Sequence, residues 1–361
     1  MLVLLAVLIV IGAALELYAF LDGVKHIGFS CKPEARHTEP GEAVTVSAEM
    51  ANTGRFPISY VKAALKCPIS AQFPEELTPT KEQFIQTVET SFRLWGRQKM
   101  KKTIQVTFEK RGIHFFKGAV IQRGDLLGLH YVTDHYDAQQ PLLVFPRALE
   151  SQTLRSAMGA YCGNMIAKRH LLRDPVLQLG VREYTGTEPM KTISWTQTAR
   201  RGQLMVREFD FTRDMSCIVL FATDGMQPGR EDILDNCCSI VRTVCEELVS
   251  RNVNVEFYTN GSLFELSQDK GGLWSCSATK GNMTDLLRTL ALLYVAPARR
   301  SGQQMAVTAA RAAGRGTAFV VVAPCETPWV SQMISTLRDS SGMDVLLLLE
   351  SDYGELRQKG Q

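Results

Sequence analysis

The sequence has 361 residues, of which 45% are hydrophobic and 21% are charged, a globular composition that excludes a disordered or fibrous protein. This length exceeds one ordinary domain and fits two domains plus an anchor. The formal net charge of +3 is too small to predict nucleic acid as a partner. Nine cysteines without framework spacing favour a reducing compartment over a disulfide-bonded secreted protein.

The chain begins with an apolar run in which Glu16 is the one charged residue between positions 2 and 21. About 20 apolar residues just span a hydrocarbon core of roughly 30 Å. A cleaved signal peptide is the alternative, but no Lys or Arg precedes the run. Basic residues follow it, namely Lys25, Lys32 and Arg36. The positive-inside rule therefore predicts a transmembrane helix within residues 1–24 of a single-pass cell-membrane protein, with its soluble part cytoplasmic.

Residues 25–150 carry the pattern of short strands. Between Ala43 and Met50 apolar side chains recur at every second position, and Asn52-Thr53-Gly54 then supplies turn chemistry. A similar alternation runs through Ile104 and Phe108. No long segment with helical periodicity interrupts these strands. Short strands between turns predict an Ig-like β-sandwich.

Residues 215–361 change to a pattern in which strands alternate with helices. Positions 217–222 form a continuous apolar run, as in a strand buried in a parallel sheet. Positions 231–251 follow as an amphipathic helix, and apolar runs at 317–323 and 345–349 predict further buried strands. The order predicts an α/β three-layer domain, so we expect an α+β multidomain protein.

The segment between these domains, residues 151–214, carries a dense group of arginines, carboxylates, glycines and aromatic residues. Its main positions are Arg182, Tyr184, Trp195, Ala199, Arg200, Gly202, Leu204, Val206, Arg207 and Glu208. This pattern closely resembles the signature of the bacterial domain-of-unknown-function family number 58. At one turn position the chain has Glu188 where the family tends to have Asp.

The resemblance implies several properties that the residues alone do not. Family members look like membrane-anchored proteins with an Ig-like β-domain and a C-terminal von Willebrand factor A-like domain. They are often encoded near MoxR-type AAA+ ATPases or transglutaminase-like membrane proteins, which the resemblance nominates as partners. No biochemical activity is established for the family, so the resemblance implies no catalytic residue.

The chemistry of the signature allows three interpretations. Arginine pairs with carboxylates in two parallel hydrogen bonds and stacks on aromatic faces, so the segment can form an ordered loop. In one interpretation Tyr184 and a buried Trp195 pack between these charges and brace the two domains. In the second, the same residues form a docking face for a partner. The third interpretation is a catalytic site.

The sequence lacks the residues of a divalent-metal site. A von Willebrand A-type domain that binds Mg²⁺ carries Asp-x-Ser-x-Ser after its first strand, because this ion needs carboxylate and hydroxyl ligands. Here the corresponding stretch, residues 223–227, has Asp224 but neither serine. Asp214 and Ser216 have suitable spacing but precede the strand. We therefore expect no metal and no other cofactor.

Other polar clusters have simple structural explanations. The densest group of possible metal ligands, interpreted as a solvated loop, is His130, Asp134, His135 and Asp137. Cysteines 237, 238 and 245 fall in a predicted helix and are interpreted as small buried side chains. His114 has apolar neighbours, and no phosphate-binding loop or zinc-protease motif occurs.

These observations predict a protein that is not an enzyme but a membrane-tethered protein-interaction scaffold. Two alternatives remain open. One is an accessory or adaptor of a MoxR-type AAA+ ATPase, and the other is an enzyme whose site cannot be recognised from the sequence.

Overall fold

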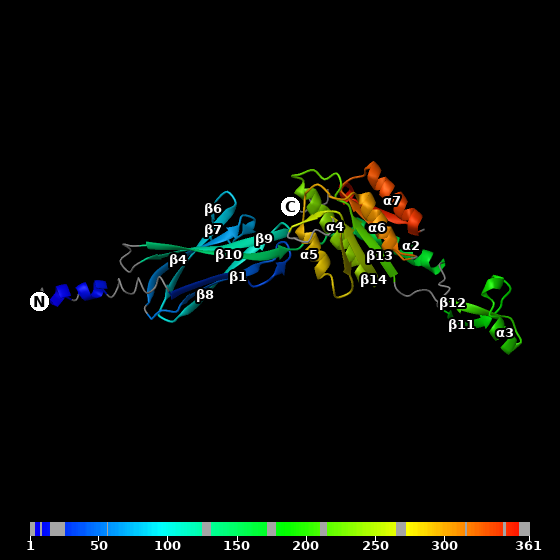
Figure 1. Ribbon diagram of the computed structural model, residues 1–361, viewed down its shortest axis with the longest axis horizontal. Coiled ribbons are helices and arrows are strands. Elements are labelled where there is room, and N and C mark those ends of the chain that lie inside the picture. Colours follow the sequence, from blue (N-terminus) through cyan, green and yellow to red (C-terminus); the bar gives the residue numbers. More distant parts are fainter. Residues whose placement is uncertain are drawn as a thin grey trace. The chain divides into compact units, whose positions relative to one another are not determined.

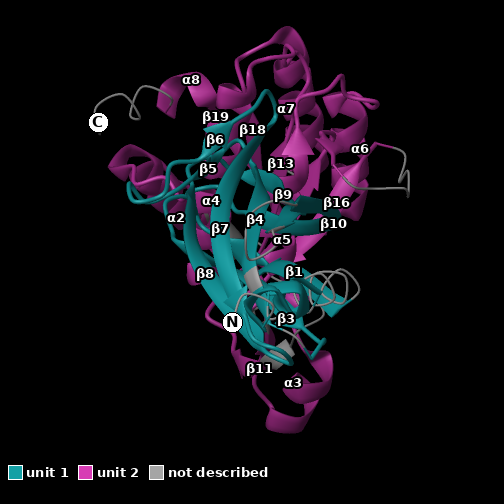
Figure 2. Cartoon of the chain, turned by 90° about the vertical axis from the view of Figure 1, so that its left-hand side faces the viewer, with its two compact units in different colours: residues 1–147 teal, residues 148–361 magenta. Residues whose placement is uncertain are grey.

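The computed structural model describes residues 4–7, 9–14, 26–55, 57–124, 131–171, 178–209, 215–264, 272–314, 316–341 and 344–353. They belong to two compact units, one ending at residue 147 and the other beginning at residue 148 (Figure 2). The first unit consists mainly of strands, and the second combines helices with a mainly parallel sheet (Figure 1). The chain is therefore an α+β protein.

The predicted transmembrane helix, residues 1–24, lies largely outside the described residues. Residues 4–7 and 9–14 are helical, and their side chains are exposed. Within the described part of the chain, no helix has both the length and the apolar character needed to cross a membrane. The anchor stays a prediction from the sequence.

The first unit is a sandwich of two β-sheets, with strand orders β1-β3-β8-β5 and β2-β10-β9-β4-β7-β6. Paired strands run antiparallel, except that β2 runs parallel to β10. The first sheet contains β1 (Ile27–Pro33), β3 (Val44–Asn52), β8 (Lys99–Phe108) and β5 (Ala71–Gln72). The second contains β2 (His37–Thr38), β10 (Tyr131–Val144), β9 (Gly112–Gly124), β4 (Ile58–Pro68), β7 (Ile85–Leu94) and β6 (Thr80–Lys81).

The core of this sandwich lies between its sheets. The face of β3 that the alternation predicted is buried: Val44, Val46, Ala48 and Met50. These side chains belong to one apolar cluster with residues of β4, β7 and β9 from the other sheet. The predicted β-sandwich is confirmed.

The second unit is organised around a five-stranded sheet of order β16-β14-β13-β18-β19. Only β16, at one edge, runs antiparallel to its neighbour. The strands are β16 (Trp274–Ala278), β14 (Val253–Thr259), β13 (Met215–Phe221), β18 (Ala318–Ala323) and β19 (Val345–Leu349). A short ribbon, β15 (Ser262–Leu263) with β17 (Leu293–Tyr294), follows the end of β14.

Helices cover both faces of this sheet, which gives the three layers seen in Figure 1. They are α2 (Gln152–Leu171), α4 (Glu231–Ser250), α5 (Thr284–Leu292), α6 (Gly302–Ala312), α7 (Pro328–Ser341) and the short α8 (Glu350–Tyr353). Cys217, Val219 and Phe221 of β13 pack in one cluster with α2, α4 and α5. Ile218 and Leu220 pack with α6 and α7 on the opposite face. The predicted α/β organisation is confirmed.

Helix α2 lies in the segment 151–214, for which the sequence predicts a link between the two domains. The Ser151 hydroxyl accepts a hydrogen bond from the Leu154 amide at 3.2 Å, as a helix N-cap does. Leu154, Met158 and Tyr161 are then buried in the same cluster as α4. The first part of the segment therefore belongs to the α/β core.

Tyr161 fastens α2 to the sheet. Its hydroxyl lies 2.7 Å from the carbonyl oxygen of Phe319 and 2.9 Å from that of Asp344, and it accepts the Phe319 amide at 3.1 Å. These contacts tie α2 to β18 and to the residue that precedes β19. Burial raises the pKa of this phenol far above its usual range, so it remains protonated and can donate.

Tyr161→Phe should lower the free energy of unfolding by about 1–3 kcal/mol, because the buried peptide groups of Phe319 lose their partner. Urea denaturation of the purified chain, followed by circular dichroism, measures this change. Tyr258→Phe is the matched control, since that hydroxyl contacts the Glu256 carboxylate at an exposed position. We expect the control to change the free energy by less than about 0.5 kcal/mol. Equal effects of the two substitutions would contradict the role given to Tyr161.

Candidate docking module

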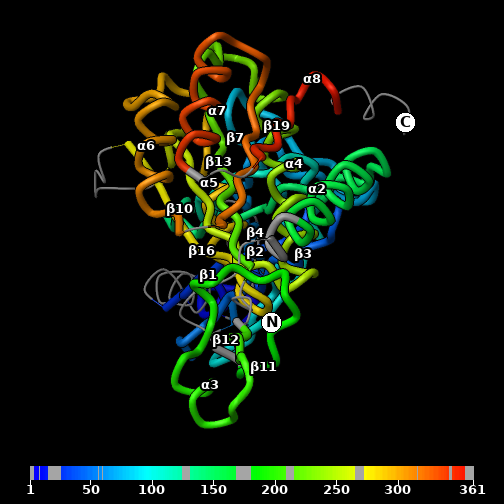
Figure 3. The backbone as a smooth tube through the Cα atoms, turned by 90° about the vertical axis from the view of Figure 1, so that its right-hand side faces the viewer, coloured from blue at the N-terminus to red at the C-terminus, as the bar shows by residue number. Residues whose placement is uncertain are grey.

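Residues 178–209, here called the signature module, form a separate set of small elements between α2 and β13 (Figure 3). Strands β11 (Gln178–Glu183) and β12 (Met205–Phe209) make an antiparallel ribbon. Between them lie the 3₁₀ turn η1 (Met190–Thr192) and the short helix α3 (Trp195–Arg201). All ten signature positions, which the sequence offers as a brace or a docking face, lie in this module.

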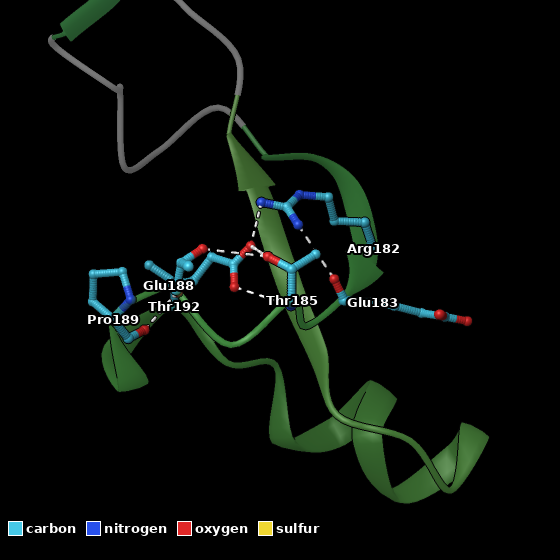
Figure 4. A network of polar contacts seen from close by, with 7 residues as sticks. Arg182, Glu183, Thr185, Glu188, Pro189 and Thr192 are labelled. Carbon is cyan, nitrogen blue, oxygen red and sulfur yellow. Dashed lines mark hydrogen bonds and ion pairs between the residues drawn. The ribbon is translucent and has the colours of Figure 1, made fainter.

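The turn after β11 is held by Glu188, as Figure 4 shows. Its carboxylate accepts the Thr185 hydroxyl at 2.7 Å and the Thr185 amide at 3.1 Å, and it pairs with the Arg182 guanidinium at 2.6 Å. The bond from the Thr185 side chain and the Arg182 contact lower the pKa of Glu188 to about 2. The carboxylate is therefore charged at neutral pH. The ion pair of Arg182 and Glu188 shapes the turn.

The helix α3 is fixed by hydrogen bonds to β12. The Thr198 hydroxyl accepts the Met205 amide at 3.0 Å, and the Ser194 amide donates to the Met205 carbonyl at 2.8 Å. Gly202 ends the helix with φ of 71°, a left-handed conformation that favours glycine, and its amide returns to the Thr198 carbonyl. This explains the signature glycine as a helix terminator.

The module has a small core, and Trp195 is not part of it. Ile193, Met205 and Val206 are buried, whereas Trp195 is 61% exposed. The expectation of a buried Trp195 is therefore wrong. The three aliphatic side chains already fill the core of this two-stranded ribbon. Burying the indole as well would require a further strand or helix packed against the ribbon.

The remaining signature residues lie outside this core and are half-buried or exposed. Arg182 and Tyr184 are half-buried, and the others, Ala199, Arg200, Gly202, Leu204, Arg207 and Glu208, are exposed. Met190, outside the signature, is 67% exposed. The module carries five basic and three acidic residues. Its exposed apolar side chains therefore lie on a module with a net positive charge. Tryptophan and arginine together are the residues that dominate binding energy at protein interfaces.

The loop after β13 uses its polar groups internally. The Asn260 side chain donates to Asp224 at 2.6 Å and to the Arg300 carbonyl at 2.9 Å, and its oxygen accepts the Thr223 amide at 2.9 Å. Asp224 also accepts the Gly302 amide, yet partial burial raises the pKa of its carboxyl. Asp224 therefore connects three loops at the end of the sheet.

Next to this network lies a cavity of about 350 Å³. It is lined by the end of β14, by the β15–β17 ribbon and by Trp274 and Arg299. The carboxyl ends of parallel strands are where open α/β sheets bind ligands. The cavity gives no signal in the sequence, because its lining comes from three separate segments between residues 260 and 299.

The remaining candidate ligands are separated or buried. Asp134 pairs with the buried Arg123, while Asp137 lies 3.9 Å from Lys66; His130 and Asp214 lie outside the described residues. The three cysteines of α4 are buried, and burial raises the pKa of Cys245 well above its usual range. In the described part of the chain, no group of three or more His, Cys, Asp or Glu side chains is placed to hold a metal ion.

One polar pair was not expected from the sequence. The Ser70 hydroxyl lies 2.8 Å from Nδ1 of His114, whose Nε2 lies 3.3 Å from the Lys110 carbonyl oxygen. The ring stacks on Phe108 with 4.6 Å between the ring centroids, and burial lowers the pKa of His114. The stacking and the two contacts hold three segments of the sandwich together. Ser70 and His114 are 44 residues apart, so spacing gave no signal.

Comparison with known proteins gives a distant relative. No family profile matches the chain. The uncharacterized protein YeaD of Bacillus subtilis is 25% identical over 156 residues, which cover 42% of this chain. The aligned part is 37% of YeaD, so the chain spans little more than a third of that relative.

Solved structures match about a third of the chain. One is the cohesin module of a Clostridium perfringens family 33 glycoside hydrolase, with 9% identity and a TM-score of 0.24 over 33% of this chain and 96% of the module. Another is a CARDB domain from Pyrococcus furiosus, with 10% identity and a TM-score of 0.23 over 33% of this chain and 90% of that domain. Scores this low carry no argument about function.

We expect isothermal titration of residues 26–361 with Mg²⁺ or Mn²⁺ to show no saturable heat below millimolar concentration. The reason is the number of ligands, since residues 223–227 supply one carboxylate and that carboxylate already accepts hydrogen bonds from Asn260 and Gly302. The control is the same titration of an Asp224→Ala variant, which should give the same trace. Tight binding that this substitution abolishes would contradict the prediction.

Proposed function

We propose that this chain is a membrane-tethered scaffold whose signature module binds another protein. The observation that carries the proposal is the exposed Trp195 on a module held together without it. Arg200 and Arg207 are exposed on the same module. A partner surface with an apolar recess and acidic side chains would complement this combination.

The contacts within the module favour docking over bracing. A brace would use the indole of Trp195 as core, but Ile193, Met205 and Val206 already fill that core. The local hydrogen bonds of Thr198 and Glu188 fix the backbone of the module, so its exposed side chains are attached to an ordered backbone. Binding then costs less ordering entropy than it would for a flexible loop.

We also propose a fold class for each unit and a family for the chain. The antiparallel two-sheet sandwich supports an Ig-like class for the first unit. The sheet with helices on both faces and an antiparallel edge strand supports a von Willebrand A-like class for the second. Together with the signature, these features support distant membership of the bacterial domain-of-unknown-function family number 58. That family nominates a MoxR-type AAA+ ATPase or a transglutaminase-like membrane protein as partner.

The strand-end cavity is a second candidate contact surface. Its position at the carboxyl end of β14 is the observation that favours it. Trp274, Tyr294 and Arg299 line it, which suits an extended peptide segment with an acidic or amide group. It remains secondary because the signature residues lie on the module.

Trp195→Ala should abolish recovery of the partner while leaving the fold intact. Because this side chain is 61% exposed, we expect the free energy of unfolding to change by less than about 1 kcal/mol. The measurement is affinity purification of the tagged full chain from detergent-solubilised membranes, with quantitative mass spectrometry. Proteins that lose at least tenfold in recovery are the partners that this module binds.

Phe84→Ala is the matched control, because Phe84 is an exposed aromatic residue on the sandwich. It should leave the recovered proteins unchanged. A strong loss of stability in Trp195→Ala would instead support the brace. Unchanged recovery with Trp195→Ala would contradict docking through the module.

Membrane topology can be tested with a native cysteine. Cys325 is exposed, whereas seven of the other eight cysteines are buried and Cys276 is half-buried. An impermeant maleimide added to spheroplasts should label Cys325 only after lysis, because the basic residues after the apolar run predict that the soluble part is cytoplasmic. Cys325→Ser identifies the labelled site by removing the signal from lysates. Labelling of intact spheroplasts would support the signal-peptide alternative.

A further inference from the structure

One end of the β-sandwich carries exposed aromatic side chains. Strands β4 and β10 begin at this end, and β7 and β9 finish there, as the pairs Ile58–Leu94 and Tyr131–Gly124 show. Tyr60 pairs with the same Gly124 from the other side. Tyr60 and Tyr131 are both exposed, Tyr131 by 63%. Two tyrosines therefore flank one glycine across three neighbouring strands.

Trp95 joins these tyrosines at the end of β7 and is 73% exposed. Its backbone is fixed, since its carbonyl accepts the Asn52 side chain at 3.1 Å and its amide donates to the Gln98 side chain at 2.8 Å. A Cβ atom on Gly96 would lie 2.1 Å from the Arg55 carbonyl oxygen, so the two turns are packed closely. The indole is thus exposed on an ordered turn.

The N-terminal part of the chain enters the sandwich at the same place. The His26 carbonyl accepts both the Thr53 amide at 2.9 Å and the Thr53 hydroxyl at 3.0 Å. This turn is hydrogen-bonded to the turn at residues 95–98, because the Arg97 amide donates to the Gly54 carbonyl at 2.9 Å. The residue that follows the apolar run and its short connection is therefore fastened to the turns that present Trp95.

Two arginines are exposed at this end of the sandwich. Arg55 and Arg97 are exposed, one in each of the two turns. Residues 52–57 and 95–98 contain no Asp or Glu. We call the set Tyr60, Trp95, Tyr131, Arg55 and Arg97 the proximal rim.

We propose that the proximal rim lies in the headgroup region of an anionic lipid bilayer. This inference rests on the proposed membrane tether. Four residues, 22–25, separate the apolar run from His26, and four residues reach at most about 14 Å. A tethered sandwich therefore has this end at the bilayer surface. Tryptophan and tyrosine concentrate at such interfaces, and arginines are attracted to anionic headgroups there.

The rim sets the orientation of the first unit. A short connection alone would leave the sandwich free to tilt. Three aromatic side chains on neighbouring turns and strands, inserted in the headgroup region, would fix its orientation relative to the bilayer. Binding of a protein at the same place is the competing explanation, and it requires no lipid.

The test uses the full chain reconstituted into vesicles of phosphatidylethanolamine and phosphatidylglycerol that contain a lipid brominated near the headgroup. Bromine quenches tryptophan emission at short range, and the chain has four tryptophans. We expect quenching in the wild type that falls to background in Trp95→Phe. Trp329→Phe is the matched control and should retain the quenching, because Trp329 lies on α7 of the second unit. Arg55→Ala combined with Arg97→Ala should reduce quenching in these anionic vesicles.

Flotation of the vesicles in a density gradient distinguishes failure of the membrane tether from failure of the proximal rim proposal. If the chain does not float with them, both the tether and the proximal rim proposal are wrong. If it floats but Trp95→Phe is quenched as strongly as the wild type, the tether stands and the rim proposal is overturned. Flotation without any quenching overturns the rim proposal in the same way and favours a protein as occupant of this surface.

Discussion

The architecture of the second unit depends on the burial of β13 on both of its faces. The side chains from Cys217 to Ala222 are almost fully excluded from solvent, which requires helices above and below the sheet. Its ends are held by polar contacts, Ser216 with Thr317 and Thr223 with Asn260. Because these polar groups hold the sheet together, the loop after the strand has few ligands left for chemistry.

Sequence patterns predicted the elements whose burial follows a regular period, and missed those that do not. The strand at 217–222 and the helix at 231–250 have clear apolar patterns and were found. Helix α2 was missed because Gly159, Gly163 and several polar residues interrupt its apolar stripe. The edge strand β16 was missed because it is short and alternates with serines. Composition also could not tell that Trp195 is exposed, since that depends on how much core the module has.

The proximal rim and the signature module both expose a tryptophan beside arginines, yet they favour different ligands. That combination suits a protein interface and a lipid interface equally well. What separates the two cases is position in the chain. The rim is bonded through Thr53 to His26, close behind an apolar run. The module follows α2 and is far along the sequence from that run. The neighbouring sequence therefore distinguishes the two surfaces better than the side chains do.

The small core of the signature module has a consequence for docking. A two-stranded ribbon is marginally stable in water, and three buried aliphatic side chains add little to it. Its order therefore depends on local bonds such as those of Glu188 and Thr198. A partner that binds only the folded module stabilises it by mass action, by about 2.7 kcal/mol when the partner is present at 100 times its dissociation constant. Folding of the module and binding of such a partner are consequently coupled.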